Sequence, residues 1–434
     1  MDMQENSRAT LLAITLASIP AFANAGPFEK IYTVGDSLSD QGNLYFATAD
    51  AVDPAPIPYP GLPRSDFYTD GVLIGRFTNG ANWIDVLAAD LGAESEPSYY
   101  LGGTNFAYGG TRTDYNTVEL DWTKPEEVQF LTWSVPQGNT FPENLYPWTL
   151  NKQVEAFAVN DISDPDGLYV VFSGSNDLAD IILMSVLPDP SDPMSPILTN
   201  TEAYARLINV VSGASNAIDK MIDAGAQDIL VPNLPNLGVV PGFTDLAPVA
   251  EFWSAEYNTL LDQMLLTKTD VNIIRFDTFT LTSEVAENPA AFGFTNATQP
   301  CYTGFVAEVP GEEVFICEDP DAYVFFDREH PTAAFHALLA ETIGYEMLSD
   351  LLNYLTSQVE QLTGGTQKSL EKKLMGAIAK LEDGNSANDQ AAIGKLQAFI
   401  NSVEAKQGKK IPQDLATSMI LRAEKIIALL EAGY

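Results

Sequence analysis

Histidine is scarce in this chain of 434 residues, which contains only His330 and His336. Asp327 stands three residues before His330, in the segment DREHP that follows an apolar run. A carboxylate at this spacing can reach the imidazole Nδ1 from the same short turn and leave Nε2 facing a nucleophile. His336 has no acidic residue at such a spacing, and we interpret it as a packing or surface histidine. The pair Asp327 and His330 is therefore a candidate base for activating a serine hydroxyl.

Ser37 is the candidate nucleophile for that base. It lies in GDSLSDQGN, where the apolar run of residues 28–35 stops at a small, acidic, hydroxyl-bearing turn. A serine just after a strand can present its hydroxyl and its own N–H to a ligand at the edge of a sheet. Asp and Ser are also good helix caps. This stretch by itself therefore leaves two interpretations open, a nucleophile and a cap of the helix that follows the strand.

Acyl transfer also needs hydrogen-bond donors that stabilise the oxyanion formed at the carbonyl. Asn176, in the segment SGSND, carries a side-chain amide directly after a second predicted strand. Gly109 and Gly110 follow a short apolar stretch, and their lack of a Cβ lets backbone N–H groups approach a substrate closely. Each feature alone also fits an ordinary turn or cap. Together, the candidates include every group that acyl transfer requires.

The elements that must position these groups alternate between strands and helices. Long helical patterns cover residues 201–225 and 250–266. Short runs of β-branched or aromatic residues that end at Gly, Asn, Asp or Pro are predicted strands, at residues 28–35, 167–174, 226–234 and 271–279. This order predicts an α/β fold with a parallel sheet covered on both faces. Such sheets bind ligands at the carboxyl ends of their strands, where Ser37 and Asn176 are expected to lie.

Four segments in this order, GDSLSDQGN, NFAYGG, GSND and DREHP, resemble the four blocks of the GDSL or SGNH family of serine esterases and lipases. The resemblance spans residues 31–340. The segment LPNLGVVP is similar to one in the exported bacterial branch, which contains esterases, phospholipases and haemolysins. The resemblance implies a three-layer α/β/α, flavodoxin-like SGNH hydrolase fold around a central parallel sheet.

Carried over position by position, the resemblance implies a role for each candidate. Ser37 would be the nucleophile, His330 the base and Asp327 the orienting acid. Gly110 and Asn176 would be the oxyanion donors, beside the Ser37 backbone N–H. The glycine is chosen because the family's donor lies five residues after the Asn of its block. This mechanism needs no metal and no organic cofactor.

We therefore expect a carboxylic-ester hydrolase that acts on acyl lipids or short-chain esters through an acyl-enzyme. The alternatives are an acyltransferase that passes the acyl group to an alcohol such as a sterol, a carbohydrate deacetylase, and a catalytically dead surface-binding protein. An α/β-hydrolase elbow is excluded because Ser37 lacks the glycine two residues later. The acyl chain length, the acceptor and the oligomeric state are left open.

Aromatic and acidic segments elsewhere have simpler interpretations. Residues 121–138 and 250–258 carry aromatic side chains that could line an acyl pocket, but we interpret them as core. Residues 161–167 resemble part of a calcium loop but lack its first ligand and its later glutamate, so we interpret them as an ordinary loop. The sequence thus predicts no metal site.

The first 25 residues resemble an export signal. Arg8 precedes an apolar stretch, and the segment ANA at residues 23–25 has the small residues that a signal peptidase requires. The stretch is too short to span a bilayer, and no other segment approaches the roughly 18 apolar residues that a span needs. We expect an exported protein, secreted or periplasmic, in which the only two cysteines, Cys301 and Cys317, form a disulfide.

Charge is unevenly distributed along the chain. It has 59 acidic and 22 basic residues, a net charge of −37, which disfavours binding to nucleic acid or to an anionic membrane. Residues 364–434 nevertheless contain ten basic and eight acidic residues, in three helical patterns. We therefore expect a hydrolase domain at residues 26–362 and a small all-α module at 363–434. The module loosely resembles the FIMAH-type modules of exported bacterial enzymes and is a candidate for attachment to a surface or matrix.

Overall fold

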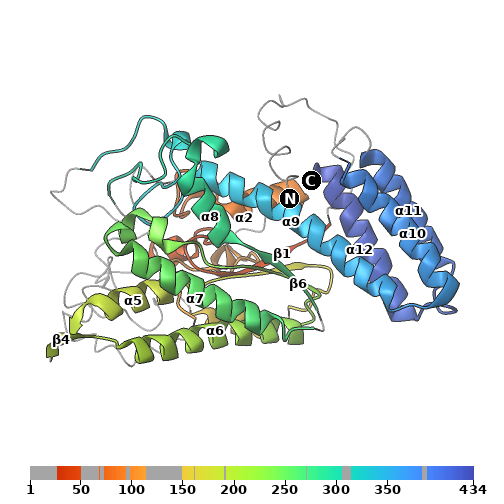
Figure 1. Cartoon of the computed structure of the whole chain (residues 1–434), viewed down its shortest axis with the longest axis horizontal. Coiled ribbons are helices and arrows are strands. Elements are labelled where there is room, and N and C mark those ends of the chain that lie inside the picture. Colours follow the sequence, from red (N-terminus) through yellow and green to blue (C-terminus); the bar gives the residue numbers. More distant parts are fainter. Residues whose placement is uncertain are drawn as a thin grey trace. The chain divides into compact units, whose positions relative to one another are not determined.

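The computed structural model (Figure 1) describes residues 27–49, 68, 73–93, 98–113, 149–160, 162–189, 192–269, 271–304, 314–383 and 389–434. Residues 1–25 and 121–138 lie outside the described residues, so the export signal and the first aromatic segment stay predictions. The chain divides into two compact units. The larger consists of residues 30–89 and 94–342, and the smaller of 1–29, 90–93 and 343–434.

The larger unit is built on a parallel sheet. Its strands are β1 (Ile31–Gly35), β2 (Leu168–Phe172), β5 (Asp228–Pro232) and β6 (Asn272–Phe276), in the order β1-β2-β5-β6. Each lies within a predicted strand, which confirms the sheet expected from the sequence. β1, β2 and β5 are buried along their whole length. Their continuous apolar runs are typical of parallel strands covered on both faces.

The segment 104–108 extends this sheet along the outer edge of β1. The Thr33 N–H donates to the Thr104 carbonyl at 3.2 Å, and the Phe106 N–H donates to the Thr33 carbonyl at 2.7 Å. The Tyr108 N–H donates to the Gly35 carbonyl at 3.1 Å. With this segment the spatial order becomes the flavodoxin-like 2-1-3-4-5, in which the chain changes direction between β1 and β2. A ligand is therefore expected at the carboxyl ends of β1 and β2.

Helices flank this sheet, as expected for the α/β/α class (Figure 1). Within the larger unit, α5, α6 and α7 pack against one another, and α4 packs against α6 and β1. In chain order, the described helices up to α9 are α1 (Asn43–Ala49), α2 (Trp83–Leu91), α4 (Leu150–Val159), α5 (Ser175–Val186), α6 (Asn200–Asp223), α7 (Ala247–Leu265), α8 (Thr278–Glu287) and α9 (Ala333–Glu360). Shorter elements are a hairpin of β3 (Pro188–Asp189) and β4 (Asp192–Pro196), and 3-10 turns at Tyr99–Leu101, Leu237–Val239, Pro241–Leu246, Pro289–Phe292 and Pro320–Ala322.

Both long helical patterns form helices close to their predicted bounds. α6 begins at Asn200 because the Thr199 side chain and Glu202 form a capping box at its start. α7 contains the second aromatic segment, in which Trp253 and Tyr257 are buried. Residues 250–258 therefore contribute mainly to the core, as expected.

The smaller unit is helical in its described residues. It contains the second part of α9 together with α10 (Gly364–Leu381), α11 (Asp389–Glu404) and α12 (Gln413–Ala432). The Arg422 guanidinium lies 4.0 Å from the centre of the Tyr354 ring, and Gln358 donates to Ser418 at 2.7 Å, so α12 packs against α9. The C-terminal helices are thus present, while a module boundary at residue 363 stays a prediction. In the described part of the chain, every helix is too short or too polar to cross a bilayer.

Candidate active site

The structure brings Ser37, His330 and Asp327 together at the carboxyl end of β1. His330 Nε2 lies 3.0 Å from Ser37 Oγ, and His330 Nδ1 lies 2.8 Å from Asp327 Oδ2. Asp327 is fully buried and His330 nearly so, whereas Ser37 is half-buried. A serine hydroxyl, an imidazole and a carboxylate thus form one continuous chain of hydrogen-bonding distances, although 290 residues of sequence separate the first from the third.

Ser37 lies in a tight turn rather than at the start of a helix. The Ser39 and Asp40 N–H groups both donate to the Asp36 carbonyl, and α1 begins only at Asn43. Asp40 accepts the N–H groups of Asn43 and Leu44 and therefore caps that helix. The cap interpretation of Ser37 is wrong for this reason. Its hydroxyl remains available to His330.

The Asp327 carboxylate is held through both of its oxygens. Oδ1 accepts the backbone N–H groups of Glu329 at 2.8 Å and His330 at 2.7 Å. Oδ2 faces His330 Nδ1 and also accepts the hydroxyl of Tyr68 at 2.5 Å. Burial by itself raises the pKa of Asp327, but the His330 charge and these hydrogen bonds outweigh it and hold the pKa below its ordinary value.

The interaction with Asp327 shifts the pKa of His330 in the opposite direction, upward. Burial by itself lowers the pKa of His330, but the Asp327 charge and hydrogen bond outweigh it and raise the pKa above 6.5. The Phe77 ring packs 5.0 Å from the imidazole, between centroids. His336 lies on α9 and is buried, and burial lowers its pKa to about 3. It is therefore a neutral packing histidine, as interpreted from the sequence.

A short segment that the sequence did not single out connects the nucleophile turn to the histidine. Arg76 donates to the Gln41 carbonyl at 2.8 Å, on the side of Ser37. Thr78 donates to the Pro331 carbonyl at 2.9 Å, and Asn79 accepts the Ala333 N–H at the start of α9. The only sequence signal here is GRFTNG, whose glycines and polar residues indicate a turn but not its neighbours.

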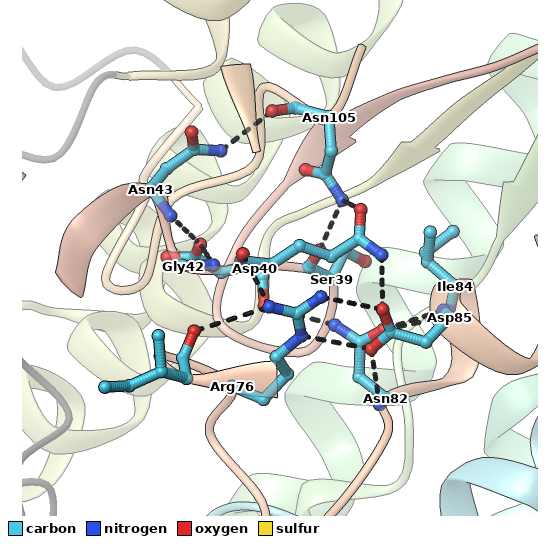
Figure 2. A network of polar contacts seen from close by, with 11 residues as sticks. Ser39, Asp40, Gly42, Asn43, Arg76, Asn82, Ile84, Asp85 and Asn105 are labelled. Atoms are coloured by element: carbon cyan, nitrogen blue, oxygen red, sulfur yellow. Dashed lines mark hydrogen bonds and ion pairs between the residues drawn. The ribbon is translucent and has the colours of Figure 1, made fainter. Parts of the chain in front are cut away.

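Figure 2 shows the polar network around Ser39 and Asp40, which follow Ser37 in the nucleophile turn. Arg76 forms a bidentate ion pair with Asp85 on α2, in which Nη2 donates to Oδ1 at 2.8 Å and Nε donates to Oδ2 at 3.1 Å. Both side chains are buried. Asn82 donates to the Asp40 carbonyl at 3.1 Å, and Asn105 donates to the Ser39 carbonyl at 2.8 Å. The turn that carries Ser37 is thus held by α2 from one side and by the segment beside β1 from the other (Figure 2).

The candidate oxyanion donors follow the strand segments next to β1. The Gly109 N–H donates to Asp40 Oδ2 at 2.8 Å, so this N–H is already used within the protein. Gly110 has a φ of 78°, a left-handed conformation that favours glycine, and its carbonyl accepts from Arg112 at 2.8 Å. Asn176 lies in the first turn of α5 and donates to the Thr111 carbonyl at 3.1 Å, so its amide faces the same segment. Of the two glycines, Gly110 is the better donor candidate.

Buried carboxyl groups surround this segment. Asp180 holds Arg112 through two contacts, at 2.7 and 2.9 Å, and Asp177 accepts both the N–H and the hydroxyl of Thr113. Burial raises the pKa of Asp177 to about 7, and the pKa of Asp36 to about 6. Such shifts are common where a site is desolvated.

Two further expectations concern residues away from these three. Cys301 and Cys317 are joined by a disulfide bond. In the segment 161–167, whose first residue is outside the described part, Asp164 accepts the N–H groups of Asp166 and Gly167, as in an ordinary loop. In the part of the chain that the structure describes, no group of three or more His, Cys, Asp or Glu side chains is arranged to hold a metal ion.

Comparison with known proteins shows which proteins this chain is similar to. The family model described as GDSL-like Lipase/Acylhydrolase matches residues 31–343. The GDSL esterase/lipase APG of Arabidopsis thaliana is 24% identical over 379 residues, which cover 80% of this chain and all of that protein. The phosphatidylcholine-sterol acyltransferase of Aeromonas hydrophila is 25% identical over 341 residues, which cover 78% of this chain and 84% of that protein.

Proposed function

Because this chain belongs to the GDSL-like lipase/acylhydrolase family and is thereby a carboxylic-ester hydrolase, we propose that Ser37, His330 and Asp327 form its catalytic triad. The observation that carries the proposal is the pair of distances at His330, 3.0 Å to Ser37 Oγ and 2.8 Å to Asp327 Oδ2. They are the hydrogen-bond distances that a nucleophile, its base and the group orienting that base require.

The reaction proceeds in two steps through an acyl-enzyme. Ser37 Oγ attacks the ester carbonyl carbon while His330 Nε2 accepts the hydroxyl proton. The bond to the alcohol oxygen then breaks, and His330 returns the proton to that oxygen. In the second step His330 takes a proton from water, whose oxygen attacks the acyl carbon. The bond from that carbon to Ser37 Oγ then breaks, His330 returns the proton to Ser37 Oγ, and the acid leaves. Asp327 stabilises the imidazolium that forms in both steps.

The negative oxygen of each tetrahedral intermediate is stabilised by the Gly110 N–H, the Asn176 side-chain amide and the Ser37 N–H. Support comes from the Gly109 N–H, which is committed to Asp40, and from the Asn176 amide, which faces the 109–113 segment. Removing one such donor typically lowers kcat by about 10²–10³-fold.

The proposed substrates are acyl lipids or short-chain carboxylic esters. A second function, transfer of the acyl group to an alcohol, uses the same first step and differs only in the molecule that attacks the acyl-serine. The similarity to a phosphatidylcholine-sterol acyltransferase favours testing it. The acceptor assay therefore belongs beside the hydrolysis assay.

Export is also part of the proposal. The apolar stretch before residues 23–25 supports cleavage after Ala25, and the Cys301–Cys317 disulfide fits an oxidising compartment. Mass spectrometry of protein recovered from a bacterial host should give Gly26 as the first residue. Recovery of uncleaved protein in the cytoplasm would contradict export. Attachment through residues 363–434 rests on the FIMAH-like resemblance alone.

Turnover of para-nitrophenyl esters from acetyl to palmitoyl tests the catalytic proposal. Ser37→Ala should lower kcat by about 10⁴-fold or more at every chain length. Ser212→Ala, at an exposed position on α6, is the matched control and should match the wild type. Retained activity in Ser37→Ala would overturn the triad. Adding a sterol during hydrolysis of a long-chain ester shows whether the acyl group is transferred.

A further inference from the structure

Tyr68 contacts the acid of the proposed triad. Its side chain is buried, and its hydroxyl donates a 2.5 Å hydrogen bond to Asp327 Oδ2, the oxygen that also faces His330 Nδ1 at 2.8 Å. We propose that Tyr68 is a positioning residue, whose hydroxyl holds Asp327 Oδ2 toward His330 and shares the negative charge of that oxygen. This inference rests on the proposed function of the triad and adds a fourth member to it.

The arrangement of donors around Asp327 shows what the tyrosine adds. Oδ1 accepts two backbone N–H groups, from Glu329 and His330, and is held by the chain itself. Oδ2 has His330 Nδ1 and the Tyr68 hydroxyl as its side-chain partners. Without the hydroxyl, the imidazole alone would hold this buried oxygen. The hydroxyl therefore keeps the carboxylate in place while the imidazole gains and loses its second proton.

The Tyr68 ring is fixed by an aromatic cluster. It packs edge-on against Tyr302 at 5.9 Å and against Phe326 at 5.1 Å, between centroids, and the Tyr302 and Phe326 rings stack on each other. All three rings are buried. Phe326 directly precedes Asp327, so the cluster fixes the donor and the acceptor relative to each other.

The backbone behind this cluster is also paired. The Cys301 N–H donates to the Phe325 carbonyl at 3.0 Å, and the Tyr302 N–H donates to the Phe326 carbonyl at 2.6 Å. The disulfide to Cys317 therefore braces the segment that leads into Asp327. The Tyr68 ring thus packs against residues whose backbone is held by hydrogen bonds and a nearby disulfide.

Electrostatics keep Tyr68 a donor. Burial, followed by the nearby Asp327 charge, raises the pKa of Tyr68 well above 10, so the hydroxyl keeps its proton at neutral pH. A donor on Asp327 Oδ2 weakens the pull of that oxygen on the imidazolium. Removing the hydroxyl should therefore strengthen this pull and raise the pKa of His330 further.

Tyr68→Phe in the full-length protein tests the inference. We expect kcat to fall about tenfold with KM nearly unchanged, because the loss of a hydrogen bond to a charged group affects the catalytic step. We also expect the acidic limb of the kcat/KM profile to move to higher pH. A lower kcat with the acidic limb at the wild-type pH would show that the substitution disturbs packing and that the hydroxyl does not act on the Asp327–His330 pair.

Tyr32→Phe is the matched control. Tyr32 is also a buried tyrosine whose hydroxyl donates to an aspartate, Asp164, at 3.2 Å, but it lies in β1 beside the loop that precedes β2. The Tyr32→Phe substitution should leave both kcat and the pH profile unchanged. Placing 3-fluorotyrosine at position 68 keeps the ring and makes a stronger donor, so it should move the acidic limb to lower pH. This second substitution serves if Tyr68→Phe does not fold.

Ser37→Ala, assayed in parallel, separates the two possible failures. If Ser37→Ala retains turnover, the triad itself is wrong. If Ser37→Ala is inactive while Tyr68→Phe has the kcat and the pH profile of the wild type, only the role of Tyr68 is wrong. An unshifted profile with 3-fluorotyrosine would contradict the inference in the same way.

Discussion

At the scale of single residues, the site depends on how His330 and Asp327 change each other's protonation. The carboxylate raises the pKa of His330 above 6.5, against the opposing effect of burial, and the pKa of Asp327 lies below 3.8. The pair therefore stabilises the fold mainly between pH 3.8 and pH 6.5, the ordinary pKa values of an aspartate and a histidine. Its contribution is lost as pH rises through the raised pKa of His330, and also as pH falls through the lowered pKa of Asp327.

Asp327→Asn should show this coupling in the kinetics. An amide leaves burial as the dominant effect on His330, so the acidic limb of kcat/KM should move from above pH 6.5 to below it. The kcat should fall by about 10⁴-fold, because the imidazole loses its orientation and tautomer. A pH–rate series on a soluble ester measures both. An acidic limb that stays in place would show that another group titrates there.

Gly109 shows how tightly the residues around the base are packed. A Cβ at this position would lie 2.3 Å from Phe77, whose ring packs against His330. Gly109→Ala should therefore displace Phe77 and disturb both the base and the adjacent Gly110. We expect kcat to fall about tenfold or more, since small misplacements in an active site are costly.

Gly394→Ala is the control for that substitution, because a Cβ there meets no atom within 4 Å on α11. Its kcat should equal that of the wild type, and its stability should rise slightly from the better helix propensity of alanine. Equal kcat values for the two variants would show that Phe77 moves aside without affecting His330.

At the scale of elements, two segments bring the three groups of the triad together. α2 supplies Asp85, which holds Arg76, and Arg76 in turn holds the backbone of the nucleophile turn. The segment that contains Arg76 continues to Thr78 and Asn79, which bind the backbone around His330. The distance between Ser37 and His330 therefore depends on a buried ion pair and one short segment.

Asp85→Asn should expose this dependence as a loss of stability. It removes the charged partner from a buried two-contact ion pair with Arg76, and removing one partner of such a pair typically costs about 3–5 kcal/mol. Urea unfolding measures the change in the free energy of unfolding. Asp383→Asn, which breaks the half-exposed pair with Lys380, is the control and should cost less than about 1 kcal/mol. Similar losses in the two variants would contradict a special role for the buried pair.

At the scale of the whole chain, the change in composition and the packing of the helices place the boundary between the two parts at different residues. The composition changes near residue 364, but the compact smaller unit already includes the chain from residue 343. Leu351, Leu355 and Val359 of α9 belong to that unit and are buried. Because α12 packs against α9, the last three helices and the second part of α9 form one core.

Ending the chain at residue 362 tests where the module begins. The truncated chain would lose the cover that α12 gives to α9, so we expect a lower melting temperature and a smaller soluble fraction. The protein that stays soluble should still hydrolyse a soluble ester, because all proposed catalytic residues precede residue 343. An unchanged melting temperature and solubility would support an independent module from residue 363.

The large negative charge leads to a salt dependence. A net charge of −37 makes the folded chain repel itself, and salt screens that repulsion. The melting temperature at pH 7 should therefore rise as NaCl increases from about 0.01 to 1 M. Near pH 4.3, where about half of the exposed glutamates are neutral, the rise should be smaller. A larger rise at the acidic pH would contradict self-repulsion as its cause.

The sequence by itself determined the elements and the three central residues of the candidate site. The strands, the long helices and the Asp327–His330 spacing are encoded by short-range patterns, because burial and hydrogen bonding repeat over a few residues. The position of Ser37 just after an apolar strand left two interpretations open, a nucleophile and a helix cap. The resemblance of four ordered segments then joined these local signals into one family.

Only the tertiary structure decided which residues support that site. Tyr68 reaches Asp327 across 259 residues of sequence, and Thr78 reaches Pro331 across 253. Nothing in the sequence around Tyr68 or Thr78 encodes such a contact, because it depends on the path of the whole chain and on side-chain packing. The choice of Gly110 over Gly109 likewise gained a physical reason only when Asp40 was found to hold the Gly109 N–H.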